Sequence, residues 1–312
     1  MTRLIDEITL FLESEGFECS RQMRDGAEVI CTRTLDGRHS RIILPLEISA
    51  VSATQAAEVS DRAYECVEFI RTLEDAPLII TEDRWRAQES MMRARLLAHL
   101  EIFSQAFARN CEVRRIEKAE ARDFLTHNHS YGYAACRYHY GLFLKRQTGH
   151  LAASLEDKES SLAPGTLIAV ATFSNARKWS KGDRVIKSYE WTRYASLPDL
   201  RVSGGMGKML KTFINDVRPD DIMSYADLEW SRGDVYSRLG FVLEGQKEPV
   251  LFSVDPRTWE RTPVKPGTTT YISDIKLSEN FEVRNSFHYN QSIDCVFISV
   301  IVSVIDFKSS DI

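Results

Sequence analysis

The chain opens with an amphipathic pattern that gives way to two apolar, β-rich runs. Apolar residues recur at near-helical spacing from Leu4 to Phe11, and the pattern stops at Gly16, which predicts one helix. Two β-rich runs follow at residues 27–34 and 40–48, and the short connection between them contains Asp36-Gly37. An Asp-Gly pair between two such runs is a strong hairpin signal. The first elements are therefore a helix and a β-hairpin.

The next segments complete a first unit. Residues 54–74 have a helical pattern, and the apolar run at 77–81 predicts a short strand. The order helix, hairpin, helix, strand predicts a small α/β module over residues 1–83. Residues 84–110 alternate charged and apolar positions and predict a helical connector to the rest of the chain.

From Cys111 the pattern changes to short strands and helices with many aromatic residues, and we expect this second unit to cover residues 111–256. The segment 257–312 then begins with a Pro- and Thr-rich stretch and is predicted to be a C-terminal extension. Its apolar run, 295–305, is about half of the roughly 20 residues that a membrane-spanning helix needs. We interpret this run as a buried strand and expect no membrane partner.

The composition excludes two broad classes. Of the 312 residues, 43% are hydrophobic, which is enough for a sizeable core and excludes wholesale disorder. The 40 basic and 45 acidic residues give a net charge of -5, so the chain does not bind nucleic acid through bulk charge. Any such contact needs a local patch, for which the candidates are Arg177, Lys178, Lys181, Arg184 and Lys187.

The six cysteines lie far apart, without the Cys and His spacing of a zinc site, so we predict no metal. They are interpreted as free thiols in a reducing compartment. The N-terminal segment carries acidic residues within its apolar stretch and lacks the continuous apolar core of a secretory signal. The expected location is the cytoplasm, or a host cytoplasm for a phage-borne gene.

The most informative segment is the glycine-rich run RVSGGMGKMLKTFIND at residues 201–216. It lies between an extended run and an amphipathic helical pattern. A glycine-rich turn that opens a helix exposes backbone N–H groups at the positive end of the helix dipole, where they bind phosphate oxygens. The alternative is a strand-to-helix turn without a ligand. We expect Gly205→Val to weaken binding at this turn without changing the thermal midpoint. The candidate cofactor-binding residues are Arg201, Val202, Gly204, Gly205, Met206, Gly207 and Lys208.

Met209 stands after Lys208, where a Walker A motif needs Ser or Thr. The run instead resembles the pyrophosphate-binding loop of the GNAT acyltransferase superfamily, whose pattern is Arg/Gln-x-x-Gly-x-Gly/Ala, although Val202 occupies its first position. About 30 residues later, the segment 236–241 matches that family's Tyr followed by Leu-Gly-Phe. The resemblance implies a mixed central sheet flanked by helices, use of acetyl-CoA or a related acyl-CoA, and Tyr236 as the acid that protonates the departing thiolate.

A closer resemblance is to the Mom-type GNAT-like proteins of phages and mobile elements. It covers roughly residues 111–255 and includes the segments FLTHNHSYG (124–132), YEWTRYA (189–195) and SYADLEWSRGDVYSRLGF (224–241). Mom-type proteins resemble acetyltransferases but modify adenine in DNA. Relatives without demonstrated modification activity share these motifs. The resemblance therefore implies DNA as a possible partner but leaves the acceptor open.

Three further polar residues in these segments are candidates for the chemistry. His129 is a candidate base or metal ligand, or else a structural histidine at a helix end. Arg193, in an aromatic strand, is a candidate for holding a phosphate or stacking on a base, with a plain surface arginine as the alternative. Asp227 is a candidate for orienting the acceptor amine or accepting its proton, with an N-cap as the alternative.

The first unit resembles, more weakly, the small nuclease-like module that precedes this domain in mobile-element proteins. Such a module needs clustered acidic residues and a lysine to hold magnesium. Asp36 and Glu47 are the plausible acids, and Ser49 stands where the lysine would be. We therefore interpret the unit as a degenerate nuclease or an unrelated recognition domain.

Three functions follow. The first is an acyltransferase that acts on a DNA base. The second is a conventional N-acetyltransferase acting on a small molecule or a protein. The third is a non-catalytic nucleic-acid-binding relative.

Overall fold

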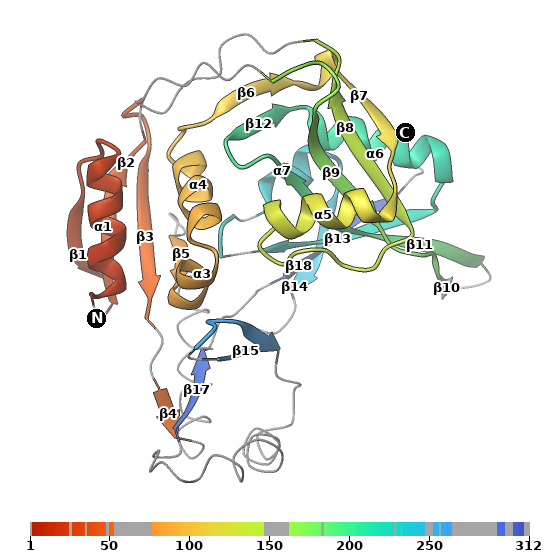
Figure 1. The fold of residues 1–312 in the computed structure, drawn as a ribbon. Coiled ribbons are helices and arrows are strands. Elements are labelled where there is room, and N and C mark those ends of the chain that lie inside the picture. Colours follow the sequence, from red (N-terminus) through yellow and green to blue (C-terminus); the bar gives the residue numbers. More distant parts are fainter. Residues whose placement is uncertain are drawn as a thin grey trace.

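A computed structural model provides the fold (Figure 1). The residues that it describes are 2–24, 27–34, 36–47, 50–52, 77–146, 162–181, 184–227, 229–231, 233–246, 252–255, 257–263, 292–296 and 302–308. The helix expected over residues 54–74 lies outside them.

The first unit is one helix packed on a four-stranded sheet. Helix α1 (Leu4–Ser14) ends before Gly16, which has a φ of 87°. The sheet order is β1-β2-β3-β5, with β3 antiparallel to β2 and parallel to β5. This confirms the expected first helix, hairpin and strand. The strands are β1 (Ser20–Arg24), β2 (Ala27–Arg33), β3 (Ser40–Leu46) and β5 (Leu78–Thr81).

The two candidate nuclease acids of this unit serve local structure instead. Asp36 accepts hydrogen bonds from the Thr34 hydroxyl (2.6 Å) and the Arg38 N–H (2.9 Å) within the hairpin turn. Glu47 accepts the Leu4 N–H at 2.9 Å at the start of α1. Because each acid is bound to a different element, they do not form a magnesium-binding pair.

The predicted helical connector is only partly helical. It contains α3 (Glu82–Ala87) and α4 (Glu89–His99), followed by strand β6 (Ser104–Phe107) and a 3-10 turn at Ala108–Asn110. The prediction of helix beyond His99 is therefore wrong, because residues 104–107 pair in parallel with β12 (Leu200–Ser203). The two helices also belong to the core of the first unit, where Trp85, Met92 and Leu96 are buried against α1.

The second unit is built on a mixed sheet of eight strands. The main path runs β14-β18-β13-β11-β9-β8-β7, with β10 paired to β11. Neighbours are antiparallel except for β11 and β13, which are parallel. The strands are β7 (Cys111–Arg115), β8 (Tyr138–Leu144), β9 (Leu167–Phe173), β10 (Arg177–Lys181), β11 (Arg184–Ser196), β13 (Asp221–Asp227), β14 (Val242–Gln246) and β18 (Val302–Lys308).

Helices cover both faces of this sheet. Phe213 of α6 (Gly205–Val217) stacks on Phe173 of β9 with ring centroids 3.8 Å apart. On the other face, Phe124 of α5 (Lys118–Asn128) belongs to the cluster that contains Val170. Alternate side chains of a strand point to opposite faces, so β9 contributes to both cores. This confirms the predicted fold class, an α/β chain whose mixed central sheet is flanked by helices and preceded by a small α/β module.

Strand β18 comes from the segment that was predicted to be a C-terminal extension. It lies between β13 and β14 and is antiparallel to both, from Asp221–Lys308 to Asp227–Val302 on the β13 side. The central sheet therefore draws on residues beyond the predicted boundary at residue 256. A separate small sheet is formed by β16 (Arg261–Pro263), β15 (Phe252–Val254), β17 (Ser292–Val296) and β4 (Ala50–Ser52).

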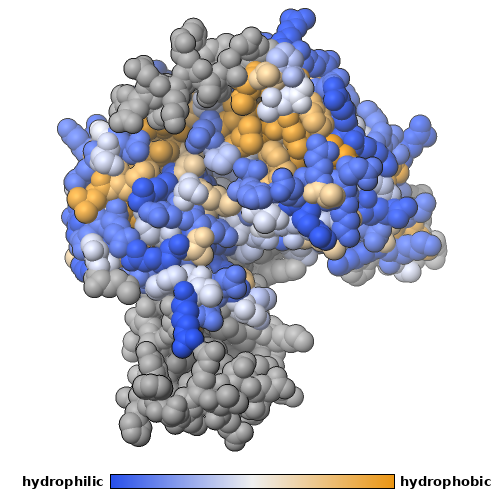
Figure 2. Space-filling model, in the orientation of Figure 1, coloured by the Kyte–Doolittle hydropathy of each residue, from blue (hydrophilic) through white to orange (hydrophobic). Residues whose placement is uncertain are grey.

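The second unit also contributes to the apolar core of the first. The loop after β13 inserts Trp230, 3% exposed, into the apolar cluster of the first unit. The Ile79 N–H of β5 donates to the Glu229 carbonyl at 2.8 Å. On the face shown in Figure 2, hydrophilic side chains cover most of the described surface, with apolar side chains gathered near the top. No described helix has both the length and the apolar character that crossing a membrane requires.

Candidate functional site

A cavity of about 820 Å³ opens where the two parallel strands of the central sheet separate. The pairing of β11 with β13 runs from Ser188–Asp221 to Trp191–Ser224, yet both strands continue, to Ser196 and Asp227. Beyond this point β11 stays paired with β9 and β13 with β18, but no longer with each other. Both of these strand ends line the cavity, together with residues of the first unit. Ligands of open α/β sheets commonly bind at the carboxyl ends of parallel strands, and this cavity has that position.

The glycine-rich turn lies at the edge of this cavity. Gly204 has a φ of 76°, a conformation that favours glycine, and stands immediately before α6. No side chain caps the helix, so its first N–H groups remain available for a ligand. Met206, in the first turn, lines the cavity. The arrangement fits the predicted phosphate-binding turn.

Contrary to the expectation from the sequence, Gly205→Val does not test ligand binding alone. A Cβ at this position would lie 3.0 Å from the Tyr194 hydroxyl oxygen and 3.0 Å from Val202 Cγ1. A valine there must displace its neighbours, so Gly205→Val would disturb packing as well as any ligand. The expectation of an unchanged thermal midpoint is therefore not supported by the geometry.

The two basic residues of the turn have different surroundings. Lys208 donates from Nζ to the backbone carbonyls of Ala108 (2.8 Å) and Cys111 (2.6 Å), so its ammonium fixes the start of β7. Arg201 is exposed, lines the cavity and lies over the Phe103 ring at 5.1 Å. Of the two, Arg201 is the one placed to meet a ligand.

Tyr236 lies on α7 (Asp234–Arg238) and lines the same cavity. Its ring packs edge-on against Trp191 and Phe241, and its hydroxyl accepts a hydrogen bond from the Ser224 hydroxyl at 3.3 Å. Burial raises the pKa of Tyr236. The phenol is therefore protonated at neutral pH, which is the state that a proton donor needs.

Asp227, at the end of β13, is held by both units. Its carboxylate accepts the Glu229 N–H at 3.0 Å and lies 3.6 Å from Arg84 Nη1 of α3. Arg84 also pairs with Glu229 at 3.1 Å, and these two side chains are 4% and 1% exposed. The carboxylate of Asp227 lines the cavity, so a buried arginine of the first unit orients a candidate catalytic group of the second.

His129 follows α5 and lines the cavity as a neutral imidazole. Its Nδ1 accepts the Tyr131 N–H at 3.1 Å, which leaves Nε2 as the protonated nitrogen. Burial, with the nearby charges of Arg193, Arg95 and Arg84, lowers the pKa of His129 to about 3. A group with this pKa is a poor proton acceptor at neutral pH, so the geometry favours a hydrogen-bonding role over the predicted base.

The lowered pKa of His129 predicts that the protein becomes less stable at acidic pH. Between pH 6.5 and about 3 the unfolded chain binds a proton at His129 that the folded chain does not, so the free energy of unfolding falls as the pH falls through this window. One such group contributes a slope of up to about 1.4 kcal/mol per pH unit. We expect His129→Asn to reduce the slope in denaturant titrations at a series of pH values. Replacing the exposed His127 by Asn is the matched control, and equal slopes for wild type and His129→Asn would contradict the prediction.

Arg193, on β11, is held by backbone carbonyls. Its Nε donates to Gly132 at 3.2 Å and its Nη1 to Thr192 at 2.8 Å, while its guanidinium lies 5.8 Å from the Tyr131 ring centre. Burial lowers the pKa of Arg193. It lines the cavity, so it combines a fixed position with a charge that faces the site.

Several site residues were not predicted from the sequence. Glu190 of β11 lines the cavity and is attracted electrostatically to Arg193. It lies within the segment YEWTRYA, so the resemblance contained the signal. Arg84 and Arg95 come from the first unit and carried no local signal. Among the described residues, no three His, Cys, Asp or Glu side chains come together as a metal site.

Comparison with known proteins gives partial structural likeness. No family model matches the chain, and no curated protein matches it. A structure of the NatC complex bound to Gag peptide and CoA is similar at 10% identity with a TM-score of 0.32, covering 64% of this chain and 98% of the other. A structure of the histone acetyltransferase HPA2 and related acetyltransferase from Corynebacterium glutamicum ATCC 13032 is similar at 15% identity with a TM-score of 0.24, covering 70% and 91%. Likeness at this level carries no functional argument, so the function proposed next rests on the chain's own residues.

Proposed function

We propose that the chain is a GNAT-type acyltransferase that moves an acyl group from acetyl-CoA or a related acyl-CoA to an amine. The observation that carries this proposal is the separation of β11 from β13. Met206 of the glycine-rich run, Tyr236 and two acidic residues, Glu190 and Asp227, line the cavity that opens there, which supports the proposal.

The donor is assigned to the side of the cavity formed by the turn and α7. The backbone N–H groups at the start of α6 are suited to the diphosphate, while Trp191, Tyr194 and Tyr236 line the neighbouring cavity wall. Gly207 lies next to the C-terminal end of α7, since a Cβ there would meet Cδ2 of Leu239, the residue after this helix, at 3.2 Å. The donor would supply an activated thioester. The residues present fit such a ligand because they combine N–H donors with a largely aromatic wall.

The chain's own groups then manage two protons. A carboxylate accepts the proton that the amine loses as it forms its new bond to the acyl carbon, and Tyr236 donates a proton to the sulfur as the C–S bond breaks. Glu190 is the better acceptor, because the oxygens of Asp227 are already engaged by the Glu229 N–H and Arg84. Asp227 then serves to orient the amine.

The finer proposal is that the acceptor is the exocyclic amine of a DNA base, as the Mom-type resemblance implies. Arg177, Lys178 and Lys187 are exposed on the β10–β11 hairpin and support contact with a phosphate backbone. The second candidate is a conventional N-acetyltransferase for a small molecule or a protein. It is favoured by the net negative charge of the chain. A non-catalytic relative would keep the cavity without turnover.

Mass spectrometry of nucleosides separates these possibilities. Purified protein is incubated with acetyl-CoA and DNA, the DNA is digested, and base adducts are compared with those of an enzyme-free sample. We expect a nucleoside whose mass is raised by the acyl group. If no adduct forms while calorimetry detects acetyl-CoA binding, the DNA acceptor is excluded and the conventional acetyltransferase is retained. If acetyl-CoA does not bind either, the acyltransferase proposal is rejected.

A further inference from the structure

Three arginines surround His99 at one end of the cavity, and we call this group the arginine wall: Arg41, Arg95 and Arg201 with His99. Arg41 of β3 donates from Nε to the His99 carbonyl at 3.3 Å. Arg95 lies one turn before His99 on α4. Arg201 comes from β12, over Phe103. All four side chains line the cavity, so elements of both units bring three arginine side chains to one place.

Three acidic residues, Glu101, Glu190 and Asp227, also line the cavity, but none of them forms a direct ion pair with the arginine wall. Burial, together with the charges of Arg95, Arg41 and Arg201, lowers the pKa of His99 to about 3, and no acidic group opposes this effect. Within the described ranges, no ion pair joins any of the three arginines to a carboxylate within 4.0 Å. Arg95 is attracted by Asp227 and Glu229, but Arg84 already pairs with both of these acids.

The cavity also contains hydrogen-bonding groups without a protein partner. Arg95 bonds the Ser130 hydroxyl at 3.4 Å and lies 4.4 Å from the Trp230 ring centre, which leaves most of its guanidinium donors for another ligand. The Arg95 side chain is only partly buried and lines the cavity, so these donors are accessible to a polar ligand.

We propose that the arginine wall binds a phosphate group of the acceptor, so that the acceptor is a nucleotide, either free or within a nucleic-acid strand. Guanidinium forks match phosphate oxygens in geometry and charge. Adenine and cytosine nucleotides carry an exocyclic amine beside that phosphate, so one ligand supplies both the anchor and the group to be acylated. The identity of this ligand as the acceptor rests on the proposed function, whereas the binding of a phosphate group does not.

The arginine wall comes mainly from the first unit, which favours binding of the acceptor's phosphate over the donor's phosphates. Three of the four members of the wall, Arg41, Arg95 and His99, belong to the first unit, and Arg95 bonds Ser130 in the loop after α5. Arg201 is the exception, since it belongs to the second unit and stands at the start of the glycine-rich run. The donor diphosphate is assigned to the glycine-rich turn of the second unit. The first unit also contacts the site directly, because its Arg84 lies 3.6 Å from Asp227 and its apolar cluster holds Trp230 of the second unit.

The test measures binding without turnover. Dissociation constants of the full-length protein are determined for deoxyadenosine monophosphate, for a short labelled single-stranded DNA and for acetyl-CoA. We expect Arg95→Met to weaken nucleotide or DNA binding about 10- to 100-fold, the loss of one charge-assisted contact, and to leave acetyl-CoA binding unchanged. For DNA, the slope of log K against log salt should fall by about one.

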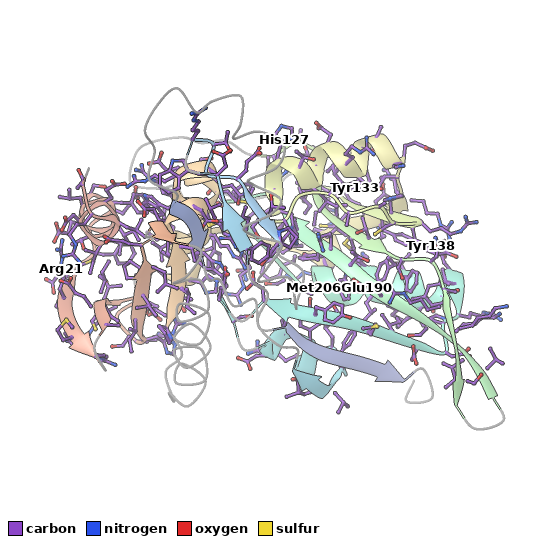
Figure 3. All side chains as sticks on the ribbon, turned by 90° about the horizontal axis from the view of Figure 1, so that it is seen from below. Arg21, His127, Tyr133, Tyr138, Glu190 and Met206 are labelled. Carbon is purple, nitrogen blue, oxygen red and sulfur yellow. The ribbon has the colours of Figure 1, made fainter. Side chains whose placement is uncertain are left out.

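Two further variants keep the result interpretable. Arg41→Met tests the same wall at a less deeply placed residue, in case the Arg95 variant loses its cooperative melting. Arg21→Met is the matched control. Arg21 lies on the outer strand β1, away from the cavity, and forms an ion pair with Asp6 of α1 (Figure 3).

Each outcome decides a point. Loss of mononucleotide binding in the wall variants identifies a free nucleotide, and loss of DNA binding alone identifies a strand. If the wall variants weaken acetyl-CoA binding instead, the arginines hold the donor's phosphates and the proposal is overturned. It is also overturned if the wild type binds neither nucleotide nor DNA, or if the wall variants behave like Arg21→Met. Nucleotide binding that depends on the wall without any acetyl-CoA binding would reject only the acyltransferase.

Discussion

Tyr236→Phe should lower the turnover of acyl transfer by roughly 10²- to 10⁴-fold, the usual contribution of a positioned proton donor. The substitution keeps the ring that packs against Trp191 and Phe241 and removes only the hydroxyl. That hydroxyl is held by Ser224, and burial raises the pKa of Tyr236, so its proton is present at neutral pH. The stability should change little, because the two lost hydrogen bonds, with the Ser224 hydroxyl at 3.3 Å and with the Tyr225 carbonyl at 3.5 Å, are long.

The measurement compares steady-state turnover of wild type and variant with the acceptor identified by mass spectrometry, beside calorimetric binding of acetyl-CoA. Tyr133→Phe is the matched control: it also removes a phenol hydroxyl, which contacts His139 Nε2 at 3.0 Å, but Tyr133 does not line the cavity. We expect the control to retain near-normal turnover. Full activity in Tyr236→Phe would exclude the phenol as the acid while leaving the cavity assignment standing.

Local patterns in the sequence were sufficient for elements whose partners lie nearby in the chain. The apolar spacing from Leu4 and the Asp36-Gly37 turn depend on neighbouring residues, and the structure confirms both the helix and the hairpin. Strand β6 was missed because the segment is short and pairs with β12, almost 100 residues away. The insertion of β18 between β13 and β14 is also a long-range pairing, which no local periodicity encodes.

The candidate site shows the same difference between residues in local motifs and residues brought in by long-range packing. The glycine-rich turn, Tyr236 and Asp227 were predicted because their motifs are contiguous, and the structure brings Met206, Tyr236, Asp227, His129 and Arg193 to one cavity. Lys208 was included by its place in the turn, but its ammonium bonds two backbone carbonyls. The arginines of the first unit could not be predicted, since their importance depends on how that unit packs against the loop after β13.

Arg84→Met should destabilise the protein by about 3–5 kcal/mol, the usual cost of leaving a buried charge without its partner. Arg84 and Glu229 are 4% and 1% exposed, and the Arg84 guanidinium also lies against the Tyr131 ring at 4.4 Å. After the substitution, the described cation that remains within ion-pair distance of Glu229 is Arg261, whose Nη1 lies 3.8 Å from it. Arg261 is already bonded to Asp83, at 2.8 Å from its Nη2, so it compensates Glu229 only in part.

The pH dependence of the stability lost in Arg84→Met shows whether the unpaired carboxylate of Glu229 causes the loss. Burial raises the pKa of Glu229 to about 7, above its ordinary value of 4.5, and removing Arg84 takes away a charge that opposes this rise. In the variant the folded state therefore holds a proton on Glu229 more tightly than the unfolded state does. Because stability then increases as the pH falls toward 4.5, the difference between variant and wild type should be smaller at pH 5 than at pH 8.

A second substitution distinguishes the contribution of the Arg84 charge to stability from that of its packing. In Arg84→Met/Glu229→Gln the uncompensated carboxylate is gone, so we expect the double variant to recover much of the stability that the single variant loses. Denaturant titrations of the four proteins in this cycle measure the coupling. Recovery of stability without recovery of turnover would show that Arg84 also orients Asp227, from which it lies 3.6 Å. If the double variant is as unstable as Arg84→Met at both pH values, Arg84 stabilises the junction of the two units through packing against Tyr131 rather than through its charge.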